Sequence, residues 1–187
     1  MRTITFITLL FSVTNLFAQT NYYAENKEFN ESGYTYVCEL TRSGDVVLRN
    51  KEYKLTEDDL KFKDTGNKFI QLDHEELELF TYESWLEFRR IFYDIIRHEF
   101  SEEEMKLLRG ADNDLYVIMF INTETGKIDE VSFNFFYKDS LKYIPISVYR
   151  HIELQLKSRC SFVIAEDGKN INYIYLWDCF EFDDTNN

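Results

Sequence analysis

The chain has 187 residues and carries 34 acidic against 21 basic side chains, which gives a formal net charge of −13. A field of that sign repels phosphate backbones and anionic membrane surfaces, so nucleic acid is excluded as a partner. Only six glycines are present, and none has the spacing of a phosphate-binding loop.

The first 18 residues have the order of a secretory signal peptide. Arg2 supplies a positive charge, an apolar stretch of about ten residues ends near Val13, and the small residue Ala18 precedes the expected cleavage site. That stretch is shorter than the roughly 20 residues that span a bilayer. No cysteine lies near the cleavage site, so no lipid anchor is expected. We therefore expect a periplasmic or secreted protein comprising residues 19–187, with 20 basic and 34 acidic residues and a net charge of −14.

The mature chain is expected to form one domain. Its length lies within the roughly 100–200 residues of a single domain. It contains one proline and no low-complexity tract, so no flexible linker is expected, and no integral membrane segment follows the signal peptide. The sequence predicts an α+β fold that is mostly β over residues 19–72, helical over 73–110 and β-rich again over 113–183.

Residues 34–49 predict a β-hairpin. Apolar residues alternate with other residues from Tyr34 to Leu40, which is the two-residue period of a strand. Ser43-Gly44-Asp45 is a turn signal, and an apolar strand returns after it. An extended lead-in is expected before residue 33.

Two helices are expected next. Over residues 81–98 the apolar side chains recur at steps of three and four, which predicts a helix with one buried face. Ser101 and Glu104 have the spacing of a capping box, so a second, short helix begins there. The recurring apolar residues of the longer helix are Trp85, Phe88, Phe92 and Ile95.

Residues 113–183 begin with a second hairpin. The continuous apolar run at 115–121 predicts a strand buried on both faces. A turn follows over 123–127, and residues 131–137 alternate as a second strand.

The last part of the chain predicts a helix and two further strands. Pro145 suits the first position of a helix that runs to residue 158. A short strand over 161–165, a turn at Asp167-Gly168 and a long strand over 171–182 complete a β-β-α-β-β module.

The order of these elements resembles the TonB C-terminal domain. In that family a strand ending in a Gly-Lys turn leads to a second strand, a helix and a final long strand. The resemblance implies the fold of residues 113–183 only, because the sequence has no counterpart of TonB's membrane anchor or proline-rich segment. The residues that carry it are Tyr116-Val117-Ile118-Met119-Phe120, Thr125-Gly126-Lys127-Ile128 and Val131-Ser132-Phe133.

Three short stretches are similar to small secreted Bacteroides-type proteins of a domain-of-unknown-function family. This resemblance implies a compartment and a lineage, and no activity. The stretches are Leu16-Phe17-Ala18-Gln19, Gly33-Tyr34-Thr35-Tyr36 and Asn172-Tyr173-Ile174.

The strand over 171–182 carries the candidate binding residues. Tyr173, Tyr175 and Trp177 share one face and form an aromatic ladder, which can stack on a sugar ring, dock a protein or pack across strands. Asp178 interrupts the opposite, apolar face, where a carboxylate needs a partner unless the strand lies near a sheet edge. The sequence therefore predicts binding at this strand, by edge pairing or by aromatic docking.

A metal site is a weaker interpretation of the acidic stretch near residue 100. His98-Glu99 and the three glutamates at 102–104 offer nitrogen and oxygen ligands. No pair of histidines stands at helical spacing, and acidic residues are typical of a helix start. No metal or other cofactor is expected.

The three cysteines, Cys38, Cys160 and Cys179, allow one disulfide in three possible pairings, or buried free thiols. A thiol nucleophile formed by Cys160 or Cys179 with His151 is disfavoured, because acidic surroundings disfavour the thiolate.

The function that the sequence favours is a non-enzymatic interaction module of the bacterial envelope or exterior, which binds a protein or a glycan through its C-terminal strand. A carbohydrate-binding module is the alternative. A polysaccharide or peptide hydrolase using Asp183 and Asp184 fits less well, because glycosidase carboxylates face each other across the scissile bond.

Overall fold

Six antiparallel strands form one sheet in the order β1-β2-β3-β5-β4-β6 in the computed structural model. The structure describes residues 23, 26–31, 33–71, 76–109, 113–136 and 140–182. The predicted signal peptide and the pair Asp183 and Asp184 lie outside these residues. The strands are β1 (Lys27–Glu31), β2 (Tyr34–Leu40), β3 (Asp45–Asn50), β4 (Asp114–Asn122), β5 (Lys127–Phe136) and β6 (Tyr173–Glu181).

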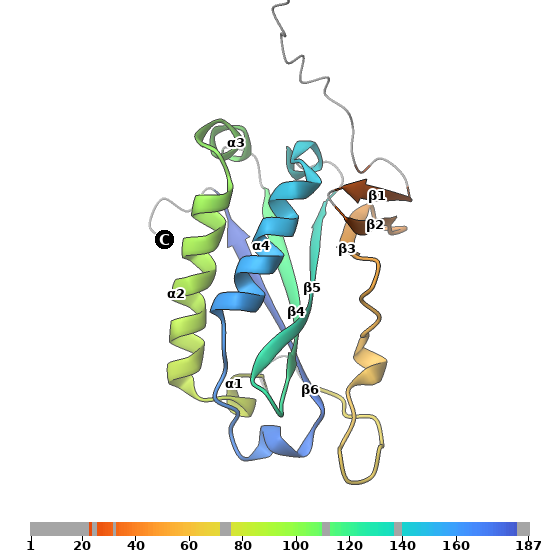
Figure 1. Cartoon of the computed structure of the whole chain (residues 1–187), viewed down its shortest axis with the longest axis vertical. Helices are drawn as coiled ribbons and strands as arrows, with labels where there is room; N and C mark the ends of the chain where they lie inside the picture. The colour runs from red at the N-terminus through yellow and green to blue at the C-terminus, as the bar shows by residue number, and fades with distance from the viewer. Residues whose placement is uncertain are drawn as a thin grey trace, which may run out of the picture.

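The helices pack on one face of this sheet, so the predicted α+β class is confirmed (Figure 1). The two long helices, α2 and α4, lie side by side, and α4 packs against β5. Within the described ranges, no helix has the length and apolar composition needed to cross a membrane. The α-helices are α1 (Glu76–Leu79), α2 (Tyr82–Glu99), α3 (Glu102–Leu108) and α4 (Ile146–Arg159), and the 3₁₀ helices are η1 (Glu57–Asp59), η2 (Ser140–Tyr143) and η3 (Asp167–Asn170).

The helix boundaries follow the capping residues. Thr81 caps α2, because its side chain accepts a hydrogen bond from the Ser84 amide. The predicted capping box of α3 is confirmed: the Ser101 amide donates to Glu104 at 2.8 Å, and the Glu104 amide donates back to the Ser101 hydroxyl. Pro145 is the N-cap of α4, one position before its first helical residue.

Both predicted hairpins are present, because β2 pairs with β3 and β4 with β5. The lead-in contains a strand of its own, β1, which pairs with β2. Before it, Tyr23 is fully buried and its hydroxyl donates to the Ile144 carbonyl at 2.8 Å. The chain is therefore already tied into the core five residues after the expected cleavage site.

The short strand expected over 161–165 is a wrong prediction. Ile164 makes only an isolated bridge with Phe80, so the C-terminal module is β4-β5-α4-β6. The backbone of this segment bonds elsewhere: the Phe162 amide donates to the Gly126 carbonyl at 2.8 Å, and the Val163 amide donates to the Ser84 hydroxyl at 2.8 Å. The hairpin turn expected at Asp167-Gly168 is instead the 3₁₀ helix η3.

The strand β4 is not buried on both faces as expected. Leu115, Val117 and Met119 face the helices and are fully buried, whereas Tyr116 and Ile118 on the other face are half-buried. The helices cover one face of the sheet only, so the second face of β4 is partly open at Tyr116 and Ile118, whereas Phe120 on that face is buried.

Candidate functional site

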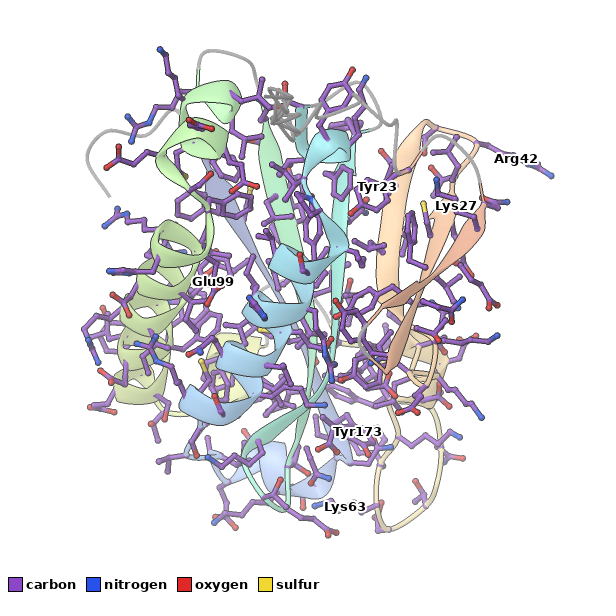
Figure 2. All side chains as sticks on the ribbon, turned by 45° about the horizontal axis from the view of Figure 1, so that its top comes forward. Tyr23, Lys27, Arg42, Lys63, Glu99 and Tyr173 are labelled. Atoms are coloured by element: carbon purple, nitrogen blue, oxygen red, sulfur yellow. The ribbon has the colours of Figure 1, made fainter. Side chains whose placement is uncertain are left out.

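The aromatic ladder lies on the face of the sheet away from the helices. Tyr173 and Tyr175 are half-buried, and the Trp177 side chain is 42 % exposed. Figure 2 shows all side chains and labels Tyr173, near the lower end of β6. Their neighbours Ile174 and Leu176 point to the helices and are fully buried, as the two-residue period predicts.

Strands β4, β5 and β6 form a shallow hollow of about 240 Å³ on this face. The strand register brings these side chains together, because Ile118 of β4 pairs with Trp177 of β6 and Tyr116 of β4 pairs with Asn134 of β5. The rings of Tyr116 and Trp177 lie 6.1 Å apart at 46°, so they pack across strands without stacking flat. We call this hollow the aromatic hollow; its lining residues are Tyr116, Ile118, Asn134, Tyr175 and Trp177.

Two polar groups of the hollow are unpartnered within the described part of the chain. The side-chain amide of Asn134 makes no hydrogen bond there, and neither does the indole N–H of Trp177. The Tyr116 hydroxyl, in contrast, contacts the Cys179 thiol. All five lining side chains are uncharged at neutral pH. The hollow therefore offers apolar ring surface beside one amide and one N–H donor.

The free edge of β6 is partly capped. Side chains bond the outward-pointing backbone: Gln71 accepts from the Tyr175 amide at 3.1 Å and donates to the Tyr175 carbonyl. The Cys179 amide donates to the Asp178 carboxylate at 2.8 Å. The Tyr173 amide donates to the Asn172 side chain at 2.9 Å. An incoming strand would have to displace these bonds, so docking on the face is favoured over pairing at the edge.

Asp178 points away from the hollow, toward the helices. Its side chain is 6 % exposed and pairs with Arg89 of α2 at 3.2 Å, while Arg89 also donates to the Tyr93 hydroxyl at 2.7 Å. Within the described residues, Asp178 Oδ2 has no hydrogen-bond partner. Burial raises the pKa of this carboxyl, and the Arg89 charge partly offsets that effect. Of the two alternatives expected for this carboxylate, the structure shows the paired one: β6 is an edge strand, but Asp178 is buried against the helices.

We expect the Asp178→Asn variant to gain stability relative to the wild type as the pH rises. The carboxyl in the folded protein has a pKa above its ordinary value of 3.8, so ionisation destabilises the fold as pH increases from there through the raised pKa. Asparagine removes this effect. Urea unfolding of both proteins at several pH values between about 3 and 7 measures the difference in unfolding free energy.

Asp94→Asn is the matched control, with the opposite expected slope. Arg159 lowers the pKa of Asp94, so its carboxylate stabilises the fold above pH 3.8 and that contribution is lost as pH falls through the lowered pKa. If the difference in unfolding free energy between Asp178→Asn and the wild type does not change with pH, ionisation of the buried Asp178 carboxyl does not destabilise the fold.

The structure brings together only part of the predicted site. Tyr175 and Trp177 line the aromatic hollow, whereas Tyr173 and Asp178 do not. Sequence reasoning missed Tyr116, Ile118 and Asn134. The alternating pattern of β5 places the polar Asn134 on the face opposite the core. That it shares a hollow with Trp177 depends on the order of the strands, which the pattern does not give.

The sequence also missed a buried polar cluster around Glu153 of α4, which is fully buried. Its carboxylate accepts hydrogen bonds from the hydroxyls of Tyr36 and Tyr53 and from Arg150 at 2.8 Å. Lys157 donates to the Tyr53 hydroxyl at 2.7 Å. Burial, together with the neighbouring Glu153, raises the pKa of both tyrosines. The cluster joins α4 to β2 and to the segment after β3.

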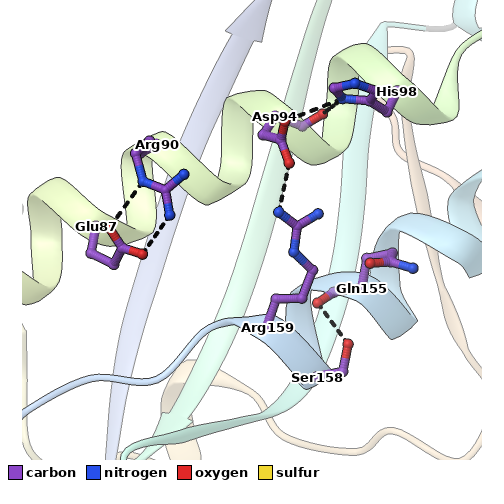
Figure 3. A network of polar contacts seen from close by, with 7 residues as sticks. All are labelled: Glu87, Arg90, Asp94, His98, Gln155, Ser158 and Arg159. Carbon is purple, nitrogen blue, oxygen red and sulfur yellow. Dashed lines mark hydrogen bonds and ion pairs between the residues drawn. The ribbon is translucent and has the colours of Figure 1, made fainter.

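The acidic stretch near residue 100 does not converge on a metal. His98 and Asp94 are 3.3 Å apart, and Asp94 also accepts from Arg159 of α4 at 2.6 Å (Figure 3). Glu99 lies 3.5 Å from His151 instead. Among the residues that the structure describes, no group of three or more acidic, histidine or cysteine side chains could hold a metal ion.

All three cysteines are free thiols, so no disulfide pairing is formed. Three strands separate Cys38 on β2 from Cys179 on β6. Burial raises the pKa of Cys160 to about 12 and that of Cys179 to about 12. His151 is exposed and paired with Glu99, so it does not serve as the base of a thiol nucleophile.

We expect slow labelling of the native thiols by iodoacetamide. With a pKa near 12, about one part in 10⁵ of Cys160 is thiolate at neutral pH. Cys38 and Cys160 should stay unlabelled in the folded protein, the half-buried Cys179 should label slowly, and all three should label in urea without reductant. Mass spectrometry counts the labels. Fewer than three labels in urea would reveal a disulfide and contradict this account.

The fold and the hollow together define an α+β domain with helices on one face of an antiparallel sheet and an open, aromatic surface on the other. Residues 19–177 match the family model described as domain of unknown function DUF5043, and the chain belongs to this family. A crystal structure of a DUF5043 family protein from Bacteroides uniformis is similar, with 31 % identity and a TM-score of 0.76 over 86 % of this chain and 87 % of that one. None of the curated proteins matches the chain.

The sequence predicted membership of a domain-of-unknown-function family with Bacteroides-type members, and the family match confirms that prediction. The likeness of residues 113–183 to the TonB C-terminal domain stays a prediction.

Proposed function

We propose that this protein is an exported, non-enzymatic binding module of the bacterial envelope or exterior, and that its partner docks on the aromatic hollow beside β6. The observation that carries the proposal is Trp177, whose large apolar ring is exposed in a concave surface that the Asn134 side chain also lines. Exposed aromatic surface with convergent polar groups is typical of binding sites.

The chemistry of the lining supports binding without catalysis. Tyr116, Ile118, Asn134, Tyr175 and Trp177 include no group that exchanges a proton near neutral pH. Burial also raises the pKa of Tyr116, which keeps its hydroxyl protonated. The hollow can therefore hold and orient a partner, and its own side chains supply no acid, base or nucleophile.

Two observations support export. The first 18 residues have the signal-peptide order described above, and the family match begins at residue 19, directly after the expected cleavage site. Tyr23, the first residue that the structure describes, lies beyond this site and is bonded into the core.

Capture from an envelope extract tests the proposed surface. Immobilised residues 19–187 are compared with the Tyr175→Ala/Trp177→Ala double variant, and bound protein and sugar are measured by mass spectrometry and monosaccharide analysis. We expect the double variant to lose at least about tenfold of the captured material, because the aromatic anchors of an interface carry most of its binding energy.

Tyr82→Ala is the matched control, because Tyr82 is an aromatic residue that is 66 % exposed at the start of α2, on the helix layer. This variant should capture as much as the wild type. If the double variant keeps the same partners at the same yield, the hollow is not the binding surface.

A further inference from the structure

The size of the aromatic hollow limits what it can hold. Its volume of about 240 Å³ is below the roughly 300–1,000 Å³ of pockets for drug-sized ligands. A stable protein partner covers about 800 Å² of each surface, with a buried apolar centre. Five residues on three strands line this hollow. A surface of that extent fits a single ring of a small ligand.

The lining matches the two kinds of surface on a pyranose ring. A pyranose has apolar C–H faces and hydroxyl groups around its rim. Trp177 and Tyr175 present aromatic ring surface, which packs well against apolar groups. The Asn134 amide can donate and accept, and the Trp177 indole N–H can donate, so both can bond hydroxyls.

The charges around the hollow select for a neutral ring. No lining residue is charged at neutral pH, so no side chain there pairs with a carboxylate, sulfate or phosphate on a sugar. Acidic side chains lie close to one end of the hollow: burial raises the pKa of Tyr116 and Cys179, and the charges of Asp114 and Glu181 raise both further. The chain as a whole carries −13, which adds to the repulsion of anionic glycans.

We infer that the aromatic hollow binds one uncharged pyranose ring of a neutral polysaccharide, with Trp177 stacked on the ring and Asn134 bonded to its hydroxyls. This inference rests on the proposed function, because it names the ligand of the same surface. Binding through one ring predicts a modest affinity, and a polymer of identical rings offers each protein molecule many equivalent positions.

Isothermal titration calorimetry tests the ligand class. Residues 19–187 are titrated with neutral hexasaccharides of glucose, mannose, galactose and xylose, and with oligogalacturonate as the anionic counterpart. We expect at least one neutral series to bind, with little dependence on salt because no ion pair forms. Oligogalacturonate should not bind. A result in which no neutral sugar binds, or in which oligogalacturonate binds more tightly, would overturn the inference.

Variants locate the binding. Trp177→Ala and Asn134→Ala should each raise the dissociation constant at least about tenfold, which corresponds to about 1.4 kcal/mol. Tyr82→Ala should bind as the wild type does. Thermal unfolding of each variant checks that the fold is kept, and Asn134→Ala tests the site even if the tryptophan variant unfolds. Neutral sugar binding that is unchanged in both variants would place the ligand elsewhere and overturn the inference.

The two proposals fail in different ways. If no sugar of the panel binds but the double variant still loses captured protein, the ligand class is wrong and the binding surface stands. If no sugar binds and the double variant captures as much as the wild type, both proposals are wrong.

Discussion

Glu153→Ala is expected to lower the free energy of unfolding by about 3–5 kcal/mol, because removing one partner of a buried charged network leaves the others unpaired. The hydroxyl of Tyr36, which is fully buried, would lose its acceptor, and so would the hydroxyl of Tyr53. Arg150 would lose a charged partner at 2.8 Å. Urea unfolding followed by circular dichroism measures the change.

Leu154→Ala is the control for this variant. Leu154 is the next residue of α4 and is 45 % exposed, so its truncation should change stability by about 0.5 kcal/mol or less. If Glu153→Ala and Leu154→Ala have similar stabilities, the buried carboxylate does not hold α4 to β2 as described.

Gly126→Ala is expected to be nearly as damaging, at about 2–5 kcal/mol. Gly126 lies in the β4–β5 turn with a φ of +66°, a conformation that costs other residues about 1–2 kcal/mol. A Cβ there would also lie 2.1 Å from the Phe162 carbonyl oxygen, and such overpacking costs about 1–3 kcal/mol more. Chemical denaturation of the variant measures the sum of the two effects.

Gly66→Ala separates these effects. Gly66 has nearly the same φ, +69°, but a Cβ there meets nothing within 4 Å. We therefore expect the backbone cost alone, about 1–2 kcal/mol. Equal losses in the two alanine variants would mean that the close approach of Phe162 to the turn is not rigid.

The elements with a strong local pattern could be predicted from the sequence. The alternation from Tyr34 to Leu40 defines β2, and the three- and four-residue steps from Trp85 to Ile95 define the buried face of α2. The Ser101 capping box needs only two residues three positions apart. In each case the information is local, so no knowledge of the tertiary contacts is required.

The predictions that failed depend on distant partners. Ser161 to Ala165 has the composition of a strand, but its amides bond to Gly126 and to Ser84, which are 36 and 79 positions away from their partners. Tertiary contacts therefore override the local strand propensity. Glu153 was missed for the same reason, because its tyrosine partners lie 117 and 100 positions away.

The candidate site could be predicted only along one strand. The two-residue period places Tyr175 and Trp177 on one face, which the structure confirms. Tyr116 and Ile118 were hidden in a continuous apolar run, and Asn134 joins them only because β5, β4 and β6 are neighbours in that register. Strand order and register set the shape of a surface, and neither follows from a single strand's pattern.

The fluorescence of Trp177 tests the central claim, that partners bind at the aromatic hollow, most directly. The chain has two tryptophans, and Trp85 lies on α2 between Phe80 and Phe88, so Trp85→Phe leaves Trp177 as the only reporter. The titrant is the material eluted from the immobilised wild-type protein. We predict a saturable blue shift of the Trp177 emission, because binding removes its exposed ring from water. Emission that stays unchanged while the variant still captures that material would contradict the account.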